Sequence, residues 1–312
     1  MSPGDSGAAP NPDWPALPYT QWRETYATLH RWTQIVGKVR LALAPPVNHW
    51  WQVPLYVGCR GLTTSPIPYG ARRFQIDFDF IAHRLVIATS DGAADGFPLR
   101  PMSVAAFYRE LMARLRALGL ELEIWTMPVE IPDPVPFEAD VAHAAYDADA
   151  AHRFWRVLLQ ADRLLTVFRS RFVGKVSPVH FFWGSFDLAV TRFSGRAAPP
   201  HPGAPNVADR VTREAYCDEV SSCGFWPGGP GMEQPVFYAY AYPAPEGFAA
   251  APVRPGAAFY SRALGEFLLP YEAVRTASSP DGALLDFCQS TYDATASLAQ
   301  WDRGRLERRV TP

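Results

Sequence analysis

Two histidines and a glutamate in the C-terminal half are of the types that hold a metal ion. His180 begins an aromatic run, His201 lies in the loop PPHPG, and Glu219 follows Asp218. A two-histidine, one-carboxylate set binds a metal when the three side chains converge and leave open coordination positions. The sequence does not place the two histidines on one helix. The alternative to a metal site is that His180 lies at a strand edge and His201 in a solvated loop. If a metal is present, we expect His180, His201 and Glu219 to be its ligands, with Asp218 as the alternative carboxylate.

Two aspartates share one face of an expected strand. The segment FQIDFDF (74–80) alternates apolar and polar residues, which is typical of a half-buried strand, and it places Asp77 and Asp79 about 7 Å apart. An enclosed carboxylate pair can split its pKa values and supply an acid and a base. A solvated sheet face is the alternative. For an enzyme, the sequence predicts Asp77, Asp79 and His180 as catalytic residues.

Two arginines and two tryptophans recur at one spacing. Arg60 and Arg192 lie 132 positions apart, as do Trp51 and Trp183. A guanidinium offers a planar fork to a carboxylate or phosphate, and aromatic rings stack on a ligand's body. We therefore predict that these four residues bind a small anionic or aromatic molecule. Structural ion pairs, for instance with Asp187, are the alternative for the arginines.

The same spacing extends to the expected helices. Apolar residues advance by three or four along 22–43 and again along 154–172, which indicates two amphipathic helices, each ending before a proline-containing turn. Each is followed by an aromatic strand, and later by a closing helix, Ser103–Leu118 or about 281–301, with Ser103 as N-cap and Gly119 after the first of these. Further strands are expected at 84–89, 121–131, 236–242 and 259–269.

These patterns predict an α+β fold made of two pseudo-repeats. Each repeat would be a helix–antiparallel sheet–helix unit, and the two would pack as one compact body. The expected divisions are a disordered N-terminus (1–13), a first repeat (14–131), a proline-rich linker (132–146), a second repeat (147–305) with an insertion at about 195–260, and a tail (306–312).

Composition narrows the class of protein. The chain has 312 residues, 48% of them hydrophobic, and a net charge of −2, which argues against a disordered chain and against nucleic-acid or membrane partners. Only Lys38 and Lys175 are lysines among 29 basic residues, a bias typical of a high-GC bacterial genome. The four cysteines form no C-x-x-C pair, and no signal peptide or long apolar run is seen, so a cytoplasmic protein with reduced thiols is expected.

Long phrases in the sequence resemble one bacterial family, catalogued as domain of unknown function 5996. They are WPALPY (14–19), LTTSPIPYG (62–70), FQIDFDF (74–80), SPVHFFWGSFDLAVTRFSG (177–195) and VSSCGFWPGG (220–229). The resemblance extends from about residue 14 to about residue 305. It implies a stand-alone bacterial protein and supplies no activity or catalytic residues.

Three classes of function remain open, and no nucleotide-binding motif points to a cofactor. The first is an enzyme acting on a small molecule in a pocket between the repeats. The second is a non-catalytic binder of an apolar ligand in an aromatic-lined cavity, and the third is a protein-interaction module. A polar cluster with perturbed pKa values would favour the enzyme, a dry aromatic cavity the binder, and a flat apolar surface the interaction module.

Overall fold

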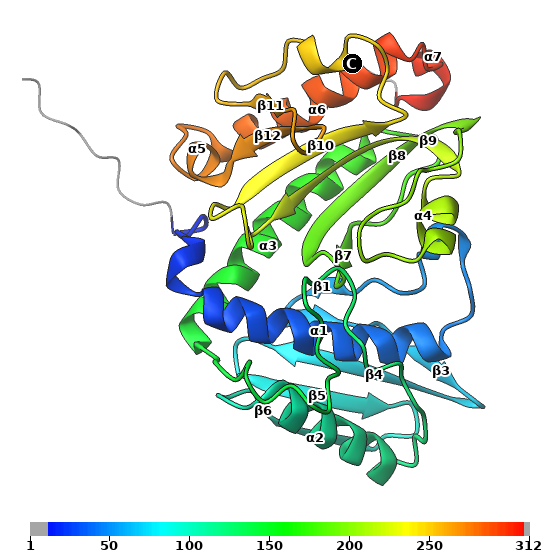
Figure 1. The fold of residues 1–312 in the computed structure, drawn as a ribbon. Helices are drawn as coiled ribbons and strands as arrows, with labels where there is room; N and C mark the ends of the chain where they lie inside the picture. Colours follow the sequence, from blue (N-terminus) through cyan, green and yellow to red (C-terminus); the bar gives the residue numbers. More distant parts are fainter. Residues whose placement is uncertain (1–11, 309–312) are drawn as a thin grey trace, which may run out of the picture.

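The computed structural model describes residues 12–308 and confirms the α+β class. Within these residues, seven α-helices accompany two antiparallel sheets of six strands each (Figure 1). The predicted disordered segment 1–13 and tail 306–312 lie largely outside the described residues. None of the described helices combines the length and the apolar character that crossing a membrane requires.

In the N-terminal half, a long helix comes first along the chain, the strands of one sheet follow, and a second long helix comes last. The sheet has the order β1-β2-β4-β5-β6, and β3 pairs with β4 beyond the end of β2. Its elements are η1 (Tyr19–Gln21), α1 (Arg23–Leu43), η2 (Asn48–Trp50), β1 (Tyr56–Gly58), β2 (Gly61–Thr63), β3 (Ile67–Tyr69), β4 (Arg72–Asp79), β5 (Arg84–Thr89), β6 (Ala94–Pro98) and α2 (Val104–Ala117). The Ser103 hydroxyl accepts the Ala106 N–H, and Gly119 has a φ of 70°, so both predicted ends of α2 are confirmed.

The C-terminal half repeats this order with additional elements. Its sheet has the order β11-β12-β10-β9-β8-β7, and α3 and α6 pack on one face of it (Figure 1). The elements are α3 (Ala148–Ser170), β7 (His180–Phe182), β8 (Asp187–Ala197), α4 (Asp209–Ala215), β9 (Asp218–Trp226), β10 (Val236–Tyr242), η3 (Phe248–Ala250), β11 (Phe259–Ser261), β12 (Glu266–Pro270), α5 (Tyr271–Arg275), α6 (Pro280–Leu298) and α7 (Arg303–Leu306).

The two sheets meet through their edge strands. Leu55 N–H donates to Phe181 O at 2.9 Å, and Phe181 N–H donates to Leu55 O at 2.8 Å. The two sheets are therefore joined at the residue before β1 in the N-terminal half and at β7 in the C-terminal half. The spacing of 132 does not match this geometry, because Arg60 lies in the turn after β1 whereas Arg192 lies inside β8. The duplication itself stays a prediction.

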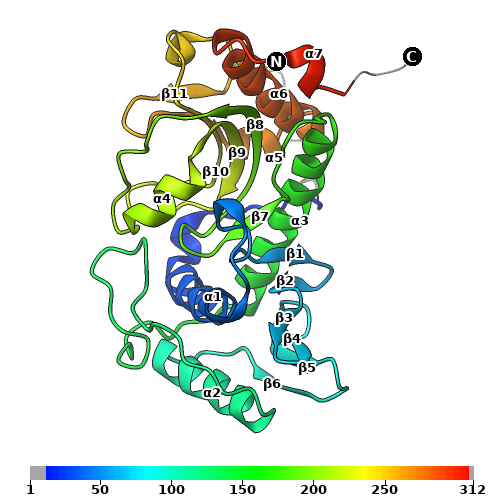
Figure 2. The same ribbon diagram turned by 90° about the vertical axis from the view of Figure 1, so that its right-hand side faces the viewer.

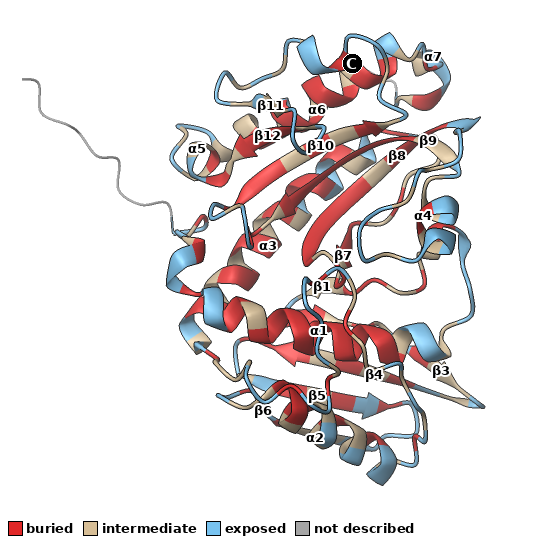
Figure 3. Cartoon of the chain, viewed as in Figure 1, coloured by how far each residue is buried: buried red, intermediate tan, exposed pale blue. Residues whose placement is uncertain are grey.

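Helix α1 is buried on every side, not along one stripe. All residues from Thr28 to Val39 are buried, polar ones included (Figure 3). Figure 2 looks along this helix and shows it in the middle of the molecule, between the sheet of β8–β10 and the elements of the N-terminal half. His30 therefore bonds to Gly184 O, and Gln34 and Lys38 donate to Val129 O and Met127 O, where the amphipathic pattern predicted a solvated face.

Two predicted strands differ from the structure. Residues 121–131 form no strand, because they lie beside α1 and no neighbouring strand pairs with them; Trp125 within them is 67% exposed. The single strand expected at 259–269 is a hairpin, since a turn at 262–265 separates β11 from β12. The turn includes Gly265 at a φ of 73°, a conformation that glycine adopts readily.

Candidate functional site: an acid–tyrosine recess

Strand β10 directs a row of tyrosines to the sheet face opposite α3 and α6. Tyr238, Tyr240 and Tyr242 alternate with alanines, so their hydroxyls share one face. In the neighbouring strand β9 the residue opposite Tyr238 is Gly224. A Cβ at Gly224 would lie 2.6 Å from the Tyr238 hydroxyl oxygen, so only glycine leaves room for that side chain to cross β9. The tyrosine thereby reaches β8.

The group that Tyr238 reaches is the carboxylate of Asp187, the first residue of β8. Tyr238 donates its hydroxyl to one carboxylate oxygen, and Ser185 donates to the other in a second short hydrogen bond. Asp187 is buried, and burial raises its pKa in spite of these two donors. The two hydroxyls hold the carboxylate in a fixed orientation on the sheet face.

Glu130 is brought to the same place by the irregular segment that follows the N-terminal half. The buried carboxamide of Gln34 in α1 donates to Val129 O at 2.8 Å and accepts the Val129 N–H at 2.9 Å. Glu130 itself has a φ of 56°, an uncommon conformation for a residue with a side chain. Its carboxylate lies over Gly184, where a Cβ would be 2.1 Å from Oε1. Helix α1 of the N-terminal half and the turn at Gly184 of the C-terminal half thus fix the position of Glu130.

Glu266, Tyr216 and His201 complete the surroundings. Glu266 begins β12, the strand next to β10. Tyr216 follows α4, and its hydroxyl lies 2.9 Å from that of Tyr240. The His201 ring stacks on Tyr216 with centroids 4.5 Å apart, and Tyr242 lies 4.8 Å from it on another side. The loop between β8 and β9 therefore forms one aromatic wall.

We call Glu130, Asp187, Tyr216, Tyr238, Tyr240 and Glu266 the acid–tyrosine recess. Asp187 is 7% exposed, the three tyrosines and Glu266 are half-buried, and Glu130 is exposed. Burial nevertheless raises the pKa of Glu130 to about 7 and that of Glu266 to about 7, with Asp187 adding to both shifts. Burial likewise raises the pKa of Tyr216 to about 12. Glu130 and Glu266 therefore lose much of their hydration to the surrounding protein, although part of each side chain reaches solvent.

The charge in this recess is unbalanced. No ion pair within residues 12–308 involves Glu130, Asp187 or Glu266, and the charged group that raises the pKa of both glutamates is Asp187. The side chains of Glu130 and Glu266 also make no hydrogen bond in the described part of the chain. Carboxyl groups that lose hydration with no cation beside them are costly to ionise unless a proton or a ligand neutralises them.

The predicted pair of aspartates has a local structural role. Asp79 accepts Arg60 Nε at 2.6 Å and the backbone N–H groups of Ile81 and Ala82 at 2.9 and 2.8 Å, which closes the β4–β5 turn. Burial opposes ionisation there, but these donors leave the pKa of Asp79 below its ordinary value. Asp77 accepts Gln75 Nε2 at 3.0 and 2.9 Å. Arg60 and Asp79 are thus in contact, in a different sheet from the recess.

Arg192, Trp51 and Trp183 lie apart from one another. Arg192 is 1% exposed, lies 3.4 Å from the centroid of the Phe168 ring, and donates through Nη2 to Phe168 O. Burial lowers its pKa to about 10, and no carboxylate within residues 12–308 forms an ion pair with it. Trp183 Nε1 donates to Val53 O at 2.8 Å, whereas Trp51 packs beside His49.

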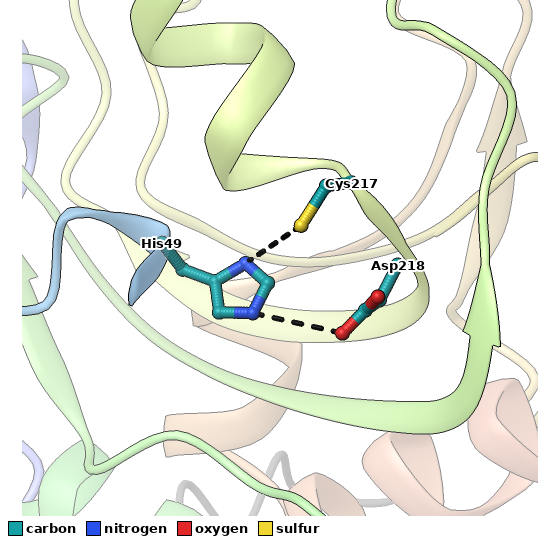
Figure 4. Close-up of side chains that lie close together, drawn as sticks. All are labelled: His49, Cys217 and Asp218. Atoms are coloured by element: carbon teal, nitrogen blue, oxygen red, sulfur yellow. Dashed lines mark hydrogen bonds and ion pairs between the residues drawn. The ribbon is translucent and has the colours of Figure 1, made fainter. Parts of the chain in front are cut away.

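The predicted metal ligands do not converge. His180 is fully buried in β7 with Nε2 3.4 Å from the Tyr56 hydroxyl, and Glu219 pairs with Arg196 at 2.6 Å. His201 belongs to the aromatic wall described above. Among the described residues a different trio of metal-ligating types lies close together: His49, Cys217 and Asp218, with all ligand atoms within 4.8 Å of one another (Figure 4). Sequence spacing missed this trio because its members come from η2 and from β9 and the residue before it.

The sequence carries only part of the signal for the recess. The alternation of Tyr238, Tyr240 and Tyr242 places three hydroxyls on one face and is readable from the sequence. Glu130 has no such signal, because it lies in an irregular segment that α1 positions. Glu266 is a single acidic residue in an apolar strand, and its neighbours depend on the strand order of the sheet.

The fold and the recess define a two-sheet α+β protein with an acidic, tyrosine-lined site. By comparison with known families, the chain belongs to the family of unknown function DUF5996, whose family model matches residues 14–308. No curated protein and no solved structure matches the chain significantly.

Proposed function

We propose that this protein acts on a small molecule bound in the acid–tyrosine recess, and that Glu130 and Glu266 exchange protons with it. The observation that carries the proposal is the set of three carboxyl groups that have no cationic partner among the described residues, beside the hydroxyls of Tyr216, Tyr238 and Tyr240. The residues come from the segment after the N-terminal half and from the C-terminal sheet, which supports the expected location between the halves.

The charge indicates which molecules fit. A cationic group would neutralise the carboxylates and find favourable contacts with tyrosine ring faces. A molecule with several hydroxyl groups would exchange hydrogen bonds with the carboxylates and phenols. An anion would meet three carboxyl groups that pair with no guanidinium of the described residues, so the recess favours an amine or a polyol over the anionic ligand suggested by the arginine pair.

Proton transfer follows from the two glutamates. With pKa values of about 7, both protonated and ionised forms of Glu130 and Glu266 are populated at neutral pH. A group in that state serves as a general acid or a general base in turn. Asp187, held by two hydroxyl donors, is placed to orient a ligand and not to move a proton.

A non-catalytic binder of a cation is the second candidate, favoured by the aromatic wall of His201, Tyr216 and Tyr242. Native mass spectrometry of the purified protein would reveal a retained ligand, and thermal-shift panels of amines, polyols and carboxylates would rank the classes. We expect amines or polyols to stabilise the protein and Tyr238→Phe to reduce the affinity.

Glu130→Gln separates the two candidates. An enzyme would retain binding and lose turnover of the identified ligand by 100-fold or more, on the scale of general acid–base catalysis. A binder of a cation would lose affinity instead. The exposed Glu246→Gln is the matched control and should change neither. Stabilisation by carboxylates alone, unaffected by Tyr238→Phe, would disprove the proposed site.

A further inference from the structure

We propose a second site, independent of the recess, in which His49, Cys217 and Asp218 bind a zinc-type transition-metal ion at a position now held by the ammonium group of Lys175. Imidazole, thiolate and carboxylate together are a ligand set that zinc uses in proteins. Figure 4 shows the three side chains converging from η2, from the residue before β9 and from the start of β9.

The imidazole of His49 is oriented as a ligand. Its Nδ1 lies 3.1 Å from Glu214 O and 3.1 Å from Ala215 O, the last carbonyls of α4. Carbonyl oxygens only accept hydrogen bonds, so Nδ1 carries the proton and Nε2 keeps its lone pair. A metal-binding histidine usually donates its second ring nitrogen to a carbonyl in this way. His49 and Trp50 also have φ values of 58° and 61°, consecutive uncommon conformations that position this ring.

A cation already occupies the space between two of the ligands. Lys175 Nζ donates to His49 Nε2 at 2.5 Å and to Asp218 Oδ2 at 2.7 Å, and these two acceptor atoms are 3.7 Å apart. The Phe193 ring lies 4.7 Å from the same ammonium. The lone pair and the carboxylate are therefore arranged around one positive charge, at a separation that two ligands of one metal ion can have.

Cys217 supplies the third ligand. Its Sγ lies 3.9 Å from His49 Nδ1, and one ligand atom from each of the three residues lies within 4.8 Å of the others. To join Asp218 at Nε2, the thiol has to turn away from the Nδ1 side of the ring (Figure 4). The residue is exposed, and the Lys175 side chain is 34% exposed, which gives the ion a route in and the ammonium a route out. Three protein ligands would leave a fourth position for water.

Binding exchanges one cation for another. Cys217 binds as the thiolate, so its S–H proton passes to solvent while a sulfur–metal bond forms. Lys175 keeps its three protons, and its hydrogen bonds to His49 and Asp218 are replaced by water. The site therefore has two states, one with lysine inside and one with metal inside, and metal affinity rises with pH.

Cobalt(II) titration of the full chain, after dialysis against a chelator, tests the site. We expect tetrahedral cobalt bands together with thiolate-to-cobalt absorption, and displacement of cobalt by zinc. Cys217→Ser should remove the thiolate absorption and weaken zinc binding at least 10-fold in calorimetry. Cys59→Ser, at another exposed cysteine, is the matched control and should leave both unchanged.

Lys175→Met gives the sharper result. Without the competing ammonium, zinc should bind about 10-fold more tightly than to the unmodified protein. A merely structural lysine predicts unchanged or weaker binding, which would overturn the exchange. Cobalt spectra without thiolate absorption, or a Cys217→Ser variant that binds zinc as tightly as the natural sequence, would overturn the site itself.

Discussion

The carboxamide of Gln34 hydrogen-bonds both backbone polar groups of Val129, 95 residues further along the chain. This contact joins the middle of the buried helix α1 to the irregular segment that carries Glu130. The contact satisfies one backbone donor and one backbone acceptor of Val129, as pairing with a neighbouring strand would. The position of a recess glutamate thus depends on a helix residue that never touches the recess itself.

Replacing Gln34 with methionine should therefore destabilise the protein. The substitution keeps the volume but leaves the Val129 N–H and C=O without partners, and we expect the free energy of unfolding to fall by about 1–3 kcal/mol. Urea denaturation followed by circular dichroism measures this. Gln160→Met is the control, since that side chain bonds only to Arg163 at the surface, and it should cost within about 0.5 kcal/mol. Equal effects of both substitutions would contradict the role given to Gln34.

The two recess glutamates should make stability fall as pH rises. In the folded protein their pKa values are about 7, against an ordinary value of 4.5, so the folded state binds these protons more tightly than the unfolded chain. Stability from this source is lost as pH rises from about 4.5 through 7. The Glu130→Gln and Glu266→Gln variants should each gain stability relative to the natural sequence at pH 8 and show little gain at pH 4.5, in thermal unfolding. A constant difference at both pH values would refute the raised pKa values.

Buried histidines should act in the opposite direction in acid. Burial lowers the pKa of His30 to about 4 and that of His180 to about 3, whereas the unfolded chain titrates near 6.5. The unfolded state therefore takes up these protons first, and stability falls as pH drops below 6.5. NMR titration should show both rings neutral at pH 5. A His180 ring that is protonated at pH 5 in the folded protein would contradict this prediction.

Gly224 should not tolerate a methyl group. Gly224→Ala would place a Cβ 2.3 Å from the Leu188 carbonyl oxygen and 2.6 Å from the Tyr238 hydroxyl oxygen, and we expect a loss of about 1–3 kcal/mol. Gly256→Ala is the control, because no atom lies within 4 Å of the Cβ position there. If the two variants unfold at the same urea concentration, Tyr238 does not depend on the missing side chain of Gly224.

Substitution by lysine should affect the stability of the protein differently at Arg192 and at Arg60, the two arginines that lie 132 positions apart. Arg192 is buried with its guanidinium carbon 3.4 Å from the centroid of the Phe168 ring and 4.3 Å from that of the Tyr292 ring. Lysine would lose these contacts of the planar guanidinium and its hydrogen bond to Phe168 O, so we expect a loss of about 2–4 kcal/mol. Arg60 is a half-exposed partner of Asp79, and lysine there should cost at most about 1 kcal/mol. Chemical denaturation compares them directly, and equal losses would argue that Arg192 is not held by its aromatic neighbours.

The amino-acid sequence by itself determined the elements whose signal is local. Period-2 alternation specified β4, β5 and β10, because neighbouring residues on a strand face opposite sides whatever lies beyond them. The Ser103 cap and Gly119 specified α2 for the same reason, since a cap acts within four residues. The α+β class follows from the succession of such elements along the chain.

Only the tertiary structure decided which side chains meet. Helix α1 has an amphipathic pattern, yet packing between the halves buries every residue from Thr28 to Val39 and directs Gln34 and Lys38 to backbone carbonyls some 90 residues away. Glu130 joins Asp187 through that packing, and His49 joins Cys217 and Asp218 through the docking of α4 on η2. Such contacts depend on the order of the strands and on how the loops dock. Both are set by the burial of the whole core, so no spacing of residues along the chain indicates them.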